Sequence, residues 1–341
     1  MLTVRAYTDA DRQAWDRFVL ATEGSHPAQL TDWLALTERT FGVARRAWLA
    51  EDGGEVRGVL PLFEKRRLGR PPVLFSAPGG LLAADGDAAR ALLGIAGDAL
   101  TRAHAEYVEL RDQRVRWPDL VTTTEHCTHL LPLGGDADTH WRAFDAKLRN
   151  QIRKAERVGF TVHWGPEHLH SFCRVMLENM RDLGTPLRAE GWFRAVLAGL
   201  GERALLLVIA RAGEPVGAMF LAVHRGCAMD LWASSLRRHF QYCPNQMLYW
   251  EAIREVIRRG LHSFDFGRSQ LDTGTYRFKQ QWGAHAVPLY YQYLLGDAAE
   301  MPSFAAQQQR MGLAVRLWKR LPLPLARVLG EPIRRRFPEL L

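Results

Sequence analysis

The stretch LVIARAGEPVGAMFLAV, Leu207–Val223, decides the fold, because it predicts two apolar strands joined by a glycine-containing turn. An earlier stretch, AWLAEDGGEVRGVLPLF at Ala47–Phe63, has the same order of strand, turn, G-E-x-x-G spacing and strand. The glycines of the two stretches correspond at an offset of 159 residues: Gly54 with Gly213, and Gly58 with Gly217. We interpret the pair as an internal repeat with a period of about half the chain.

The flanking segments extend the repeat, because helical periodicity precedes each hairpin and a further helix and strand follow it. In the first half we expect helices at Asp9–Ala21, Gln29–Phe41 and Asp87–Ala105, and a strand at Glu106–Arg111. In the second half we expect helices at Thr139–Gly159, His168–Leu183, Ala189–Leu200 and Asn245–Gly260, and a strand at His262–Arg268. This order predicts an α+β fold with mixed, mostly antiparallel sheets. We predict domains at residues 1–135 and 136–298 and a tail at 299–341, with the first boundary in the Gly/Asp cluster Leu133–Asp138.

The composition is that of a soluble globular protein: 47% of the 341 residues are hydrophobic and 24% are charged. The sequence has no apolar run of about 18 residues that would predict a transmembrane helix, and its N-terminus does not resemble a signal peptide. The four cysteines lack metal-like spacing, and we expect reduced thiols in a cytoplasmic protein. The histidines show no paired spacing either, so no metal site is assigned.

The net charge of +8 lies mostly in the tail. Residues 301–341 hold eight bases and two acids, which is +6 of the total, so the body gives little support to general nucleic-acid binding. Within the tail, Met311–Leu321 alternates apolar and basic residues before LPLPL ends the helix. A short helix of this kind can lie on anionic lipid, or it can pack against the body of the protein.

The segment FDAKLRNQIRKAERV, Phe144–Val158, predicts an amphipathic helix. Its apolar positions are Phe144, Leu148, Ile152, Ala155 and Val158. The polar positions form either a solvated basic face or a clamp for a phosphate or diphosphate. The candidate ligands of that clamp are Lys147, Arg149, Asn150 and Arg153.

The segment FDFGRSQLDTGTYRFKQQWG, Phe264–Gly283, places an acid on a strand between two phenylalanines. Its D-F-G triplet does not indicate a kinase, because the other kinase motifs are missing. Asp265 faces the side of the strand opposite Phe264 and Phe266, where it is a candidate base or the partner of Arg268. Tyr276, Phe278 and Lys279 follow a polar turn, where the lysine is a candidate to stabilise an oxyanion and the aromatic rings are candidates for core packing.

A third segment, YCPNQMLYW at Tyr242–Trp250, leads into a helix. Asn245 is expected to cap this helix, and the alternative is a ligand phosphate or carbonyl at the same helix N-terminus.

Three motifs in this order resemble the FemAB-like branch of the GNAT acyltransferase superfamily: KLRNQIRKAERVGF, YCPNQMLYWEAI and FDFGRSQLDTGTYRFKQQWGAHAVPLYY. More narrowly, the chain resembles the FemAB-related proteins associated with exosortase/PEP-CTERM systems. The resemblance implies two tandem GNAT-like (acyl-CoA N-acyltransferase-like) domains, the second holding the active site. It also implies an acyltransferase (EC 2.3), of the N-acyltransferase or Fem aminoacyltransferase type.

The expected reaction is direct transfer of an acyl or aminoacyl group to an amine of a peptidoglycan or exopolysaccharide precursor, without a covalent intermediate. The resemblance places Phe278 and Lys279 at the reaction centre, and we add Asp265 as a catalytic residue. We expect the substrate to be bound by Lys147, Arg149, Asn150, Arg153, Tyr242, Asn245, Arg268 and Tyr276.

The donor stays open between acyl-CoA and aminoacyl-tRNA, and no tightly bound cofactor is expected. The usual GNAT pyrophosphate loop does not precede Asn245, and Leu183–Leu200 is too short for the coiled-coil arm of some tRNA-dependent Fem ligases. The expected acceptor is a small-molecule, lipid-linked or UDP-linked envelope precursor. The alternative is a non-catalytic scaffold of an envelope assembly, peripheral to the inner membrane through the tail.

Overall fold

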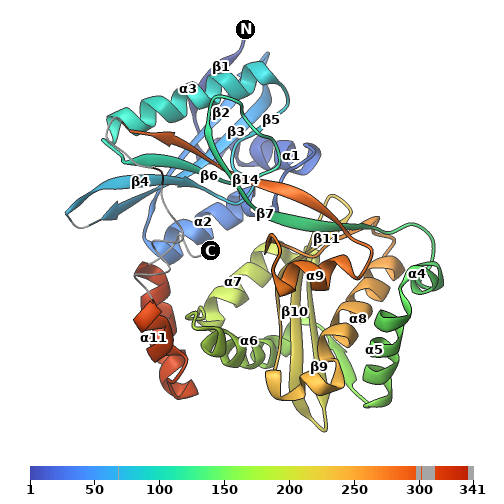
Figure 1. Cartoon of the computed structure of the whole chain (residues 1–341). Helices are drawn as coiled ribbons and strands as arrows, with labels where there is room; N and C mark the ends of the chain where they lie inside the picture. The colour runs from blue at the N-terminus through green and yellow to red at the C-terminus, as the bar shows by residue number, and fades with distance from the viewer. Residues whose placement is uncertain (68, 297–300, 302–311, 337–341) are drawn as a thin grey trace. The chain divides into compact units, whose positions relative to one another are not determined.

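The computed structural model describes residues 1–67, 69–296, 301 and 312–336, which belong to two compact units (Figure 1). The first unit comprises Met1–Cys127 and Pro288–Ser303, and the second comprises Thr128–Val287 and Phe304–Leu341. The chain therefore passes between the units within strands β7 (Val121–Pro132) and β14 (His285–Leu295). The assignment of residues 1–135, 136–298 and 299–341 to two domains and a tail stays a prediction, and much of that tail lies outside the described residues.

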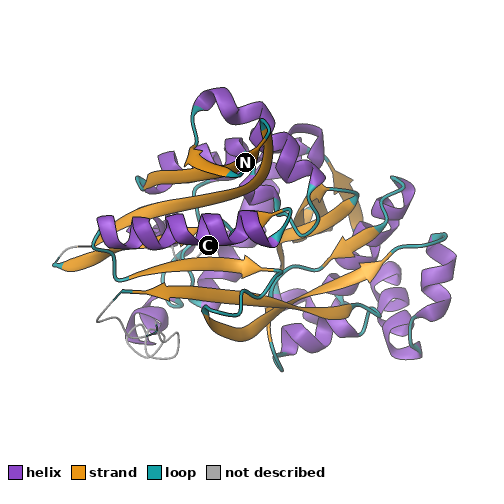
Figure 2. Ribbon diagram, turned by 90° about the horizontal axis from the view of Figure 1, so that it is seen from above, coloured by secondary structure: helices purple, strands orange, loops and turns teal. Residues whose placement is uncertain are grey.

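The sheet of the first unit has the strand order β1-β2-β3-β4-β6-β14. Its neighbours pair antiparallel except β4 and β6, which run parallel. A parallel pair needs a crossover, and helix α3 (Gly86–Arg102) supplies it. Figure 2 shows this long helix beside the strands of the first unit. The other elements are β1 (Thr3–Ala6), η1 (Asp9–Asp11), α1 (Arg12–Ala21), η2 (Pro27–Gln29), α2 (Thr31–Phe41), β2 (Ala44–Asp52), β3 (Glu55–Arg67), β4 (Arg70–Ser76), β5 (Leu82–Ala83) and β6 (Tyr107–Gln113).

The sheet of the second unit has the order β7-β12-β11-β10-β9-β8, and again all neighbours are antiparallel except one pair, β11 and β12. Helices α6 and α7 lie on one side of its strands, and α5 and α8 lie on the other (Figure 1). The elements are α4 (Ala137–Ala143), α5 (Ala146–Arg157), β8 (Thr161–Trp164), η3 (Pro166–His168), α6 (Leu169–Leu183), α7 (Glu190–Leu200), η4 (Gly201–Arg203), β9 (Ala204–Arg211), β10 (Glu214–His224), β11 (Cys227–Ser235), η5 (Arg237–Tyr242), α8 (Pro244–Arg258), β12 (Ser263–Asp265), β13 (Ser269–Gln270), α9 (Gly274–Gln280) and α11 (Leu323–Arg336).

The predicted α+β fold and its internal repeat are confirmed. The two quoted stretches form the hairpins β2–β3 and β9–β10, and both pair antiparallel. In each unit the hairpin leads to one more antiparallel strand, then to a crossover helix (α3 or α8), and then to a strand parallel to the one before the helix.

The predicted apolar face of the basic helix is also confirmed. Phe144, Leu148, Ile152 and Ala155 are buried in the core of the second unit, and Val158 packs against that core. The face meets α8, which contributes Leu248 and Ile253 among others. Since about 25 cal/mol is gained per Å² of apolar surface removed from water, this contact orients α5 with its basic residues outward.

Three predicted elements have different limits. The expected helix Thr139–Gly159 is two helices, because Phe144 is extended and the Asp145 carboxylate caps a new helix by accepting from the Leu148 N–H (2.6 Å). The expected strand His262–Arg268 ends at Asp265, where the chain turns at Gly267 with φ of +72°. In the tail, residues 312–318 are helical and α11 follows, a second helix that the sequence analysis did not predict.

None of the described helices combines the length and hydropathy that crossing a membrane would require.

Candidate active site

Asp265 ends β12 with its side chain only 2% exposed. Its Oδ1 accepts hydrogen bonds from the Gly267 N–H (2.8 Å) and from the Thr128 hydroxyl. Phe264 and Phe266 lie in the hydrophobic core on the other side, as the alternation of the strand predicts. The carboxylate therefore fixes the turn after β12, and it does so without exposure to bulk water.

Lys279 lies in α9 and is 4% exposed. Its Nζ donates to the carbonyl oxygens of Gly267 (2.7 Å) and Arg268 (3.0 Å). A buried ammonium group needs such acceptors, because removing it from water without partners is costly. The ammonium thus ties α9 to the turn that follows β12 and brings a positive charge close to Asp265.

The segment Tyr276–Lys279 has the pattern Y-x-F-K, and we call it the Y-x-F-K motif. Its two aromatic residues face different neighbours. Phe278 packs against the rings of Tyr249 (5.2 Å between centroids) and Trp282 (6.2 Å), so it belongs to the aromatic core of the second unit. Tyr276 meets the ring of His129 edge to face at 4.8 Å. The Tyr276 contact holds α9 against β7, and the Phe278 contact holds it against α8.

Asp230 on β11 is a site residue that the sequence analysis missed. Its Oδ2 accepts from the Tyr249 hydroxyl (2.6 Å), while its Oδ1 is enclosed and has no hydrogen-bond partner among the described residues. Burial raises the pKa of this carboxyl to about 6, although the Lys279 charge opposes the shift. A carboxylate inside the strand CAMDLWASS was the available signal, because an acid is rarely buried without a reason.

His129 on β7 was missed as well. It is fully buried, and neither ring nitrogen has a hydrogen-bond partner in the part of the chain that the structure describes. Burial, and then the charge of Lys279, lower the pKa of His129 to about 4, so its ring is neutral at pH 7. His129 and the Oδ1 atom of Asp230 are therefore two enclosed polar groups close to Lys279 whose hydrogen-bonding capacity no described residue uses.

Among the described strands, none pairs with β11 beyond Met229 on the side of β12, and we call this stretch the free edge of β11. Strand β11 pairs with β10 from Cys227 to Ser235 except at Leu231, but its parallel pairing with β12 covers only Cys227–Met229. The register against β10 shifts so that Leu231 has no partner, which is a β-bulge. Gly267 comes so close that a Cβ there would lie 2.5 Å from the Asp230 carbonyl oxygen. Beyond this point the free edge can accept an extended ligand through main-chain hydrogen bonds.

The predicted phosphate clamp lies on α5. Lys147, Asn150 and Arg153 are exposed and Arg149 is half-buried. Arg149 donates to the Arg142 carbonyl oxygen (3.2 Å), and Arg153 donates weakly to the Asn150 side chain (3.4 Å). The helix begins close to α9, because Phe144 packs on Trp282 with ring centroids 5.4 Å apart. A clamp role stays a prediction.

Three other predicted residues lie apart from Asp265 or point elsewhere. Asn245 does not cap α8: the helix begins at Pro244 after a left-handed Cys243, and the Asn245 Oδ1 accepts from the Ser235 hydroxyl (2.6 Å). The Tyr242 ring lies under the Arg211 guanidinium, 4.1 Å from its carbon. Arg268 has an exposed side chain, and only its carbonyl group is tied to Lys279.

Within the described residues, no group of three or more His, Cys, Asp or Glu side chains is arranged to hold a metal ion.

Comparison with known proteins identifies the fold. Residues 142–280 match the family model described as the acetyltransferase (GNAT) domain. A comparison with curated protein sequences finds no match.

Among solved structures, FemX has a TM-score of 0.69 and 17% identity, and the alignment covers 92% of this chain and 100% of FemX. The C-terminal domain of a protein described as a lysylphosphatidylglycerol synthetase from Agrobacterium fabrum has a TM-score of 0.56 at 13% identity, with coverages of 84% and 92%. A tandem GNAT protein from the clavulanic acid biosynthesis pathway has a TM-score of 0.55 at 14% identity, with coverages of 88% and 100%. The chain therefore shares the fold of FemX and of the tandem GNAT protein, and its residues 142–280 match the GNAT domain.

Proposed function

We propose that this protein is an acyltransferase that moves an acyl or aminoacyl group onto the amine of a cell-envelope precursor. The observation that carries the proposal is the Oδ1 atom of Asp230, which has no hydrogen-bond partner among the described residues and belongs to the strand with the free edge, within the segment that matches the GNAT domain. The free edge would hold the donor, and the carboxylate would receive the proton of the acceptor amine.

In the proposed reaction, the nitrogen of the acceptor amine attacks the ester or thioester carbonyl carbon of the donor. The C–N bond forms and Asp230 takes the proton that the nitrogen loses. The C–O or C–S bond then breaks, and the departing oxygen or sulfur receives a proton. Asp230 suits this role because a carboxyl with pKa about 6 is ionised at pH 7–8 and is a stronger base than an ordinary aspartate.

Asp265, Lys279 and Phe278 remain the proposed catalytic residues. Their contacts in the structure suggest a more specific role for each. Lys279 would supply positive charge near the developing oxyanion while it holds the Gly267 and Arg268 carbonyl groups. Asp265 would fix that turn, and Phe278 would hold α9 against Tyr249. The residues Lys147, Arg149, Asn150, Arg153, Tyr242, Asn245, Arg268 and Tyr276 stay proposed substrate contacts.

The donor is proposed to be an acyl-CoA or an aminoacyl-tRNA, and the acceptor a peptidoglycan or exopolysaccharide precursor. The similar structures support this range, since one is a GNAT protein of the clavulanic acid pathway and another is named for a lysylated phospholipid. An association with exosortase/PEP-CTERM systems rests on the sequence resemblance.

The test is a transfer assay with acyl-CoAs and charged tRNA as donors and UDP-linked or lipid-linked precursors as acceptors. We expect one donor class to raise the melting temperature and to be consumed, because a ligand of the native state stabilises it by mass action. Asp230→Asn should then lower kcat at pH 8 by 10²-fold or more, with little change in the donor Kd. An equal kcat in wild type and variant would contradict the role of Asp230, and no transfer from any donor would contradict the enzyme.

A second candidate is a non-catalytic scaffold at a membrane, and the tail favours it. Leu313 and Leu317 on residues 312–318, and Leu325 and Leu329 on α11, are 42–70% exposed at a spacing of four residues. Basic residues adjoin the first pair, namely Arg316, Lys319 and Arg320. Apolar and basic side chains on one helix surface suit an anionic lipid bilayer.

Vesicle pelleting tests this candidate. The full chain should pellet with anionic vesicles and less with neutral ones, and Leu325→Ser with Leu329→Ser should weaken pelleting several-fold. Leu20→Ser, at a site in α1 that is 41% exposed, is the matched control. Equal recovery with both vesicle types would rule the candidate out.

A further inference from the structure

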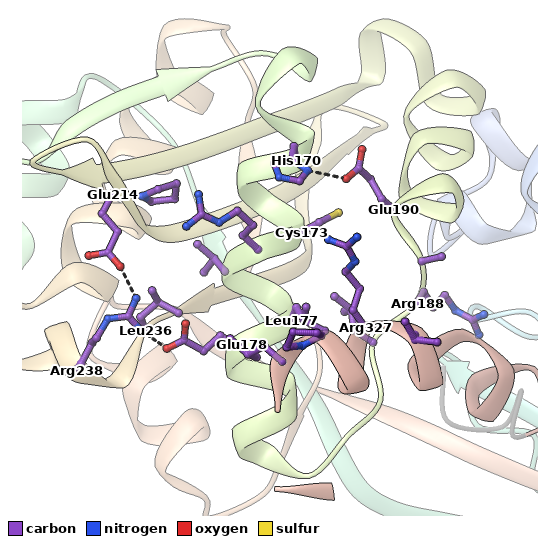
Figure 3. Close-up of a pocket in the computed structure, with 18 residues that line it drawn as sticks. His170, Cys173, Leu177, Glu178, Arg188, Glu190, Glu214, Leu236, Arg238 and Arg327 are labelled. Atoms are coloured by element: carbon purple, nitrogen blue, oxygen red, sulfur yellow. Dashed lines mark hydrogen bonds and ion pairs between the residues drawn. The ribbon is translucent and has the colours of Figure 1, made fainter. Parts of the chain in front are cut away.

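The second unit contains a cavity of about 910 Å³ that shares no residue with the proposed active site (Figure 3). Its walls come from four parts of the unit: α6, the segment 187–190, the start of β10 with the end of β11, and α11. The volume is within the range of roughly 300–1,000 Å³ that is usual for small-molecule sites.

Most of the wall is apolar. Val175 and Leu177 come from α6, Leu236 follows β11, and Leu323 and Val328 come from α11. An apolar lining of this size favours a ligand with an apolar chain or ring system.

The acids of the wall already have partners. Glu178 and Glu214 both accept from the Arg238 guanidinium, and Glu190 pairs with His170 (3.0 Å) (Figure 3). Glu190 also accepts from Arg194 (2.7 Å), which lies outside the wall. The hydrogen bonds from His170 and Arg194 hold the pKa of Glu190 below its usual value. These carboxylates therefore leave little negative charge for a cationic ligand to use.

Two arginines of the wall are in the opposite situation. Arg174 on α6 and Arg327 on α11 make neither a hydrogen bond nor an ion pair with any residue that the structure describes. Figure 3 shows the Arg327 side chain running from α11 towards Cys173 on α6. The cavity thus offers two available guanidinium groups beside an apolar wall, and guanidinium groups bind carboxylate and phosphate in a bidentate way.

We propose that this cavity binds an amphiphilic anion, an apolar chain that carries one carboxylate or phosphate group, with Arg174 and Arg327 holding the anionic group. The proposal does not rest on acyl transfer, because none of the residues assigned to that reaction lines the cavity.

Helix α11 closes one side of the cavity and is held by specific contacts. The Ala189 N–H donates to the Glu331 carboxylate (2.9 Å), and Arg181 donates to the Leu321 carbonyl oxygen (2.8 Å). Gly330 lies so close to the segment 187–190 that a Cβ there would be 2.4 Å from the Leu187 carbonyl oxygen. Affinity for the amphiphile should therefore depend on how α11 is seated.

The first experiment titrates the full chain, below the critical micelle concentrations, with hexadecanoate, hexadecyl phosphate and the neutral hexadecanol, by calorimetry. We expect at least one anion to bind ten-fold or more tightly than the alcohol, since hydrogen bonds to charged groups are the strong ones. The anion that binds with the higher affinity indicates whether the site suits a fatty acid or a lipid phosphate. Equal affinity for all three probes, or no binding, would overturn the proposal.

The second experiment uses variants. Arg174→Gln with Arg327→Gln should weaken anion binding about ten-fold or more and leave hexadecanol binding unchanged, while Arg157→Gln on α5 should change neither. Gly330→Ala should weaken anion binding several-fold without any change of charge. Its control is Gly191→Ala in α7, where a Cβ would meet no atom within 4 Å. Unchanged affinity in the double arginine variant would show that the anions bind elsewhere.

Discussion

At the scale of single residues, the region around Lys279 combines two titratable groups whose pKa values shift in opposite directions. Asp230 has a raised pKa and His129 a lowered one, with burial as the first cause of both. The sequence predicted Lys279 in this region from the motif resemblance, and Asp265 from its position on a strand between two phenylalanines. It did not predict Asp230 and His129, because their importance comes from neighbours distant in the sequence, such as Tyr249 on α8 and Lys279 on α9.

Asp230→Asn should change how stability depends on pH. The folded pKa of about 6 lies above the unfolded value, so the contribution of Asp230 to stability is fully present below about pH 4 and is lost as pH rises through 6. Asparagine never ionises, so the variant should exceed the wild type by up to about 3 kcal/mol at pH 8 and match it near pH 4. Urea unfolding at the two pH values measures this, and an equal difference at both would contradict the assignment.

His129→Leu should have the opposite effect. The folded pKa of about 4 lies below the usual value of 6.5, so the stability that neutral His129 permits is present above pH 6.5 and is lost as pH falls through 4. Leucine cannot take up a proton, so the variant should gain up to about 3 kcal/mol over the wild type near pH 4. Guanidinium unfolding at pH 4.5 and 7.5 gives the comparison; a constant offset would show that His129 does not titrate as described.

Lys279→Ala should lower stability as well as turnover. The change leaves the buried carbonyl groups of Gly267 and Arg268 without their donor, which costs about 2–4 kcal/mol. Arg277→Ala on the same helix, an exposed position, should stay within about 0.5 kcal/mol. Rates should therefore be compared at a temperature where circular dichroism shows each variant folded. Wild-type stability in Lys279→Ala would mean that these carbonyl groups have other partners.

At the scale of elements, hydrophobic patterns predicted which helices and strands exist, and local hydrogen bonds set where they end. The apolar steps of Phe144–Val158 gave the correct buried face of α5. They did not show the break at Asp145, because a capping aspartate in a helical pattern looks like any other polar residue. The early end of β12 has the same origin, since the turn depends on hydrogen bonds made to Asp265 by Gly267 and Thr128.

Gly267→Ala tests the close approach of β11 and the turn after β12. The new Cβ would lie 2.5 Å from the Asp230 carbonyl oxygen, and the residue has a positive φ. We expect a loss of more than about 2 kcal/mol and lower activity, because the free edge of β11 would shift. Gly283→Ala has a similar φ of +80° but no atom within 4 Å, so it should cost only about 1 kcal/mol. Equal losses in thermal unfolding would show that strain alone, and not the close approach, matters.

At the scale of the whole molecule, the repeat was predictable because each unit has its own hairpin, crossover helix and parallel strand. The cavity under α11 was not predictable, since its walls come from segments that are more than 80 residues apart in the sequence, such as Leu236 and Leu323.

The opposite pKa shifts of Asp230 and His129 also combine in the stability of the whole molecule. Between pH 4 and 6.5 the contributions of Asp230 and His129 to stability have opposite slopes, so the wild type should show less pH dependence from this pair than either variant.

The path of the chain between the units sets the order in which they can be completed during synthesis. Strand β6 of the first unit pairs with β14, which begins at His285, after the second unit has been made from Thr128 to Ala284. Helix α11, a wall of the cavity, is made later still. A nascent chain that has just released Gln280 from the ribosome would therefore hold the whole Y-x-F-K motif, yet the first sheet would still lack its last strand and the cavity its last wall. Chains cut short within this interval should expose apolar surface and depend on chaperones.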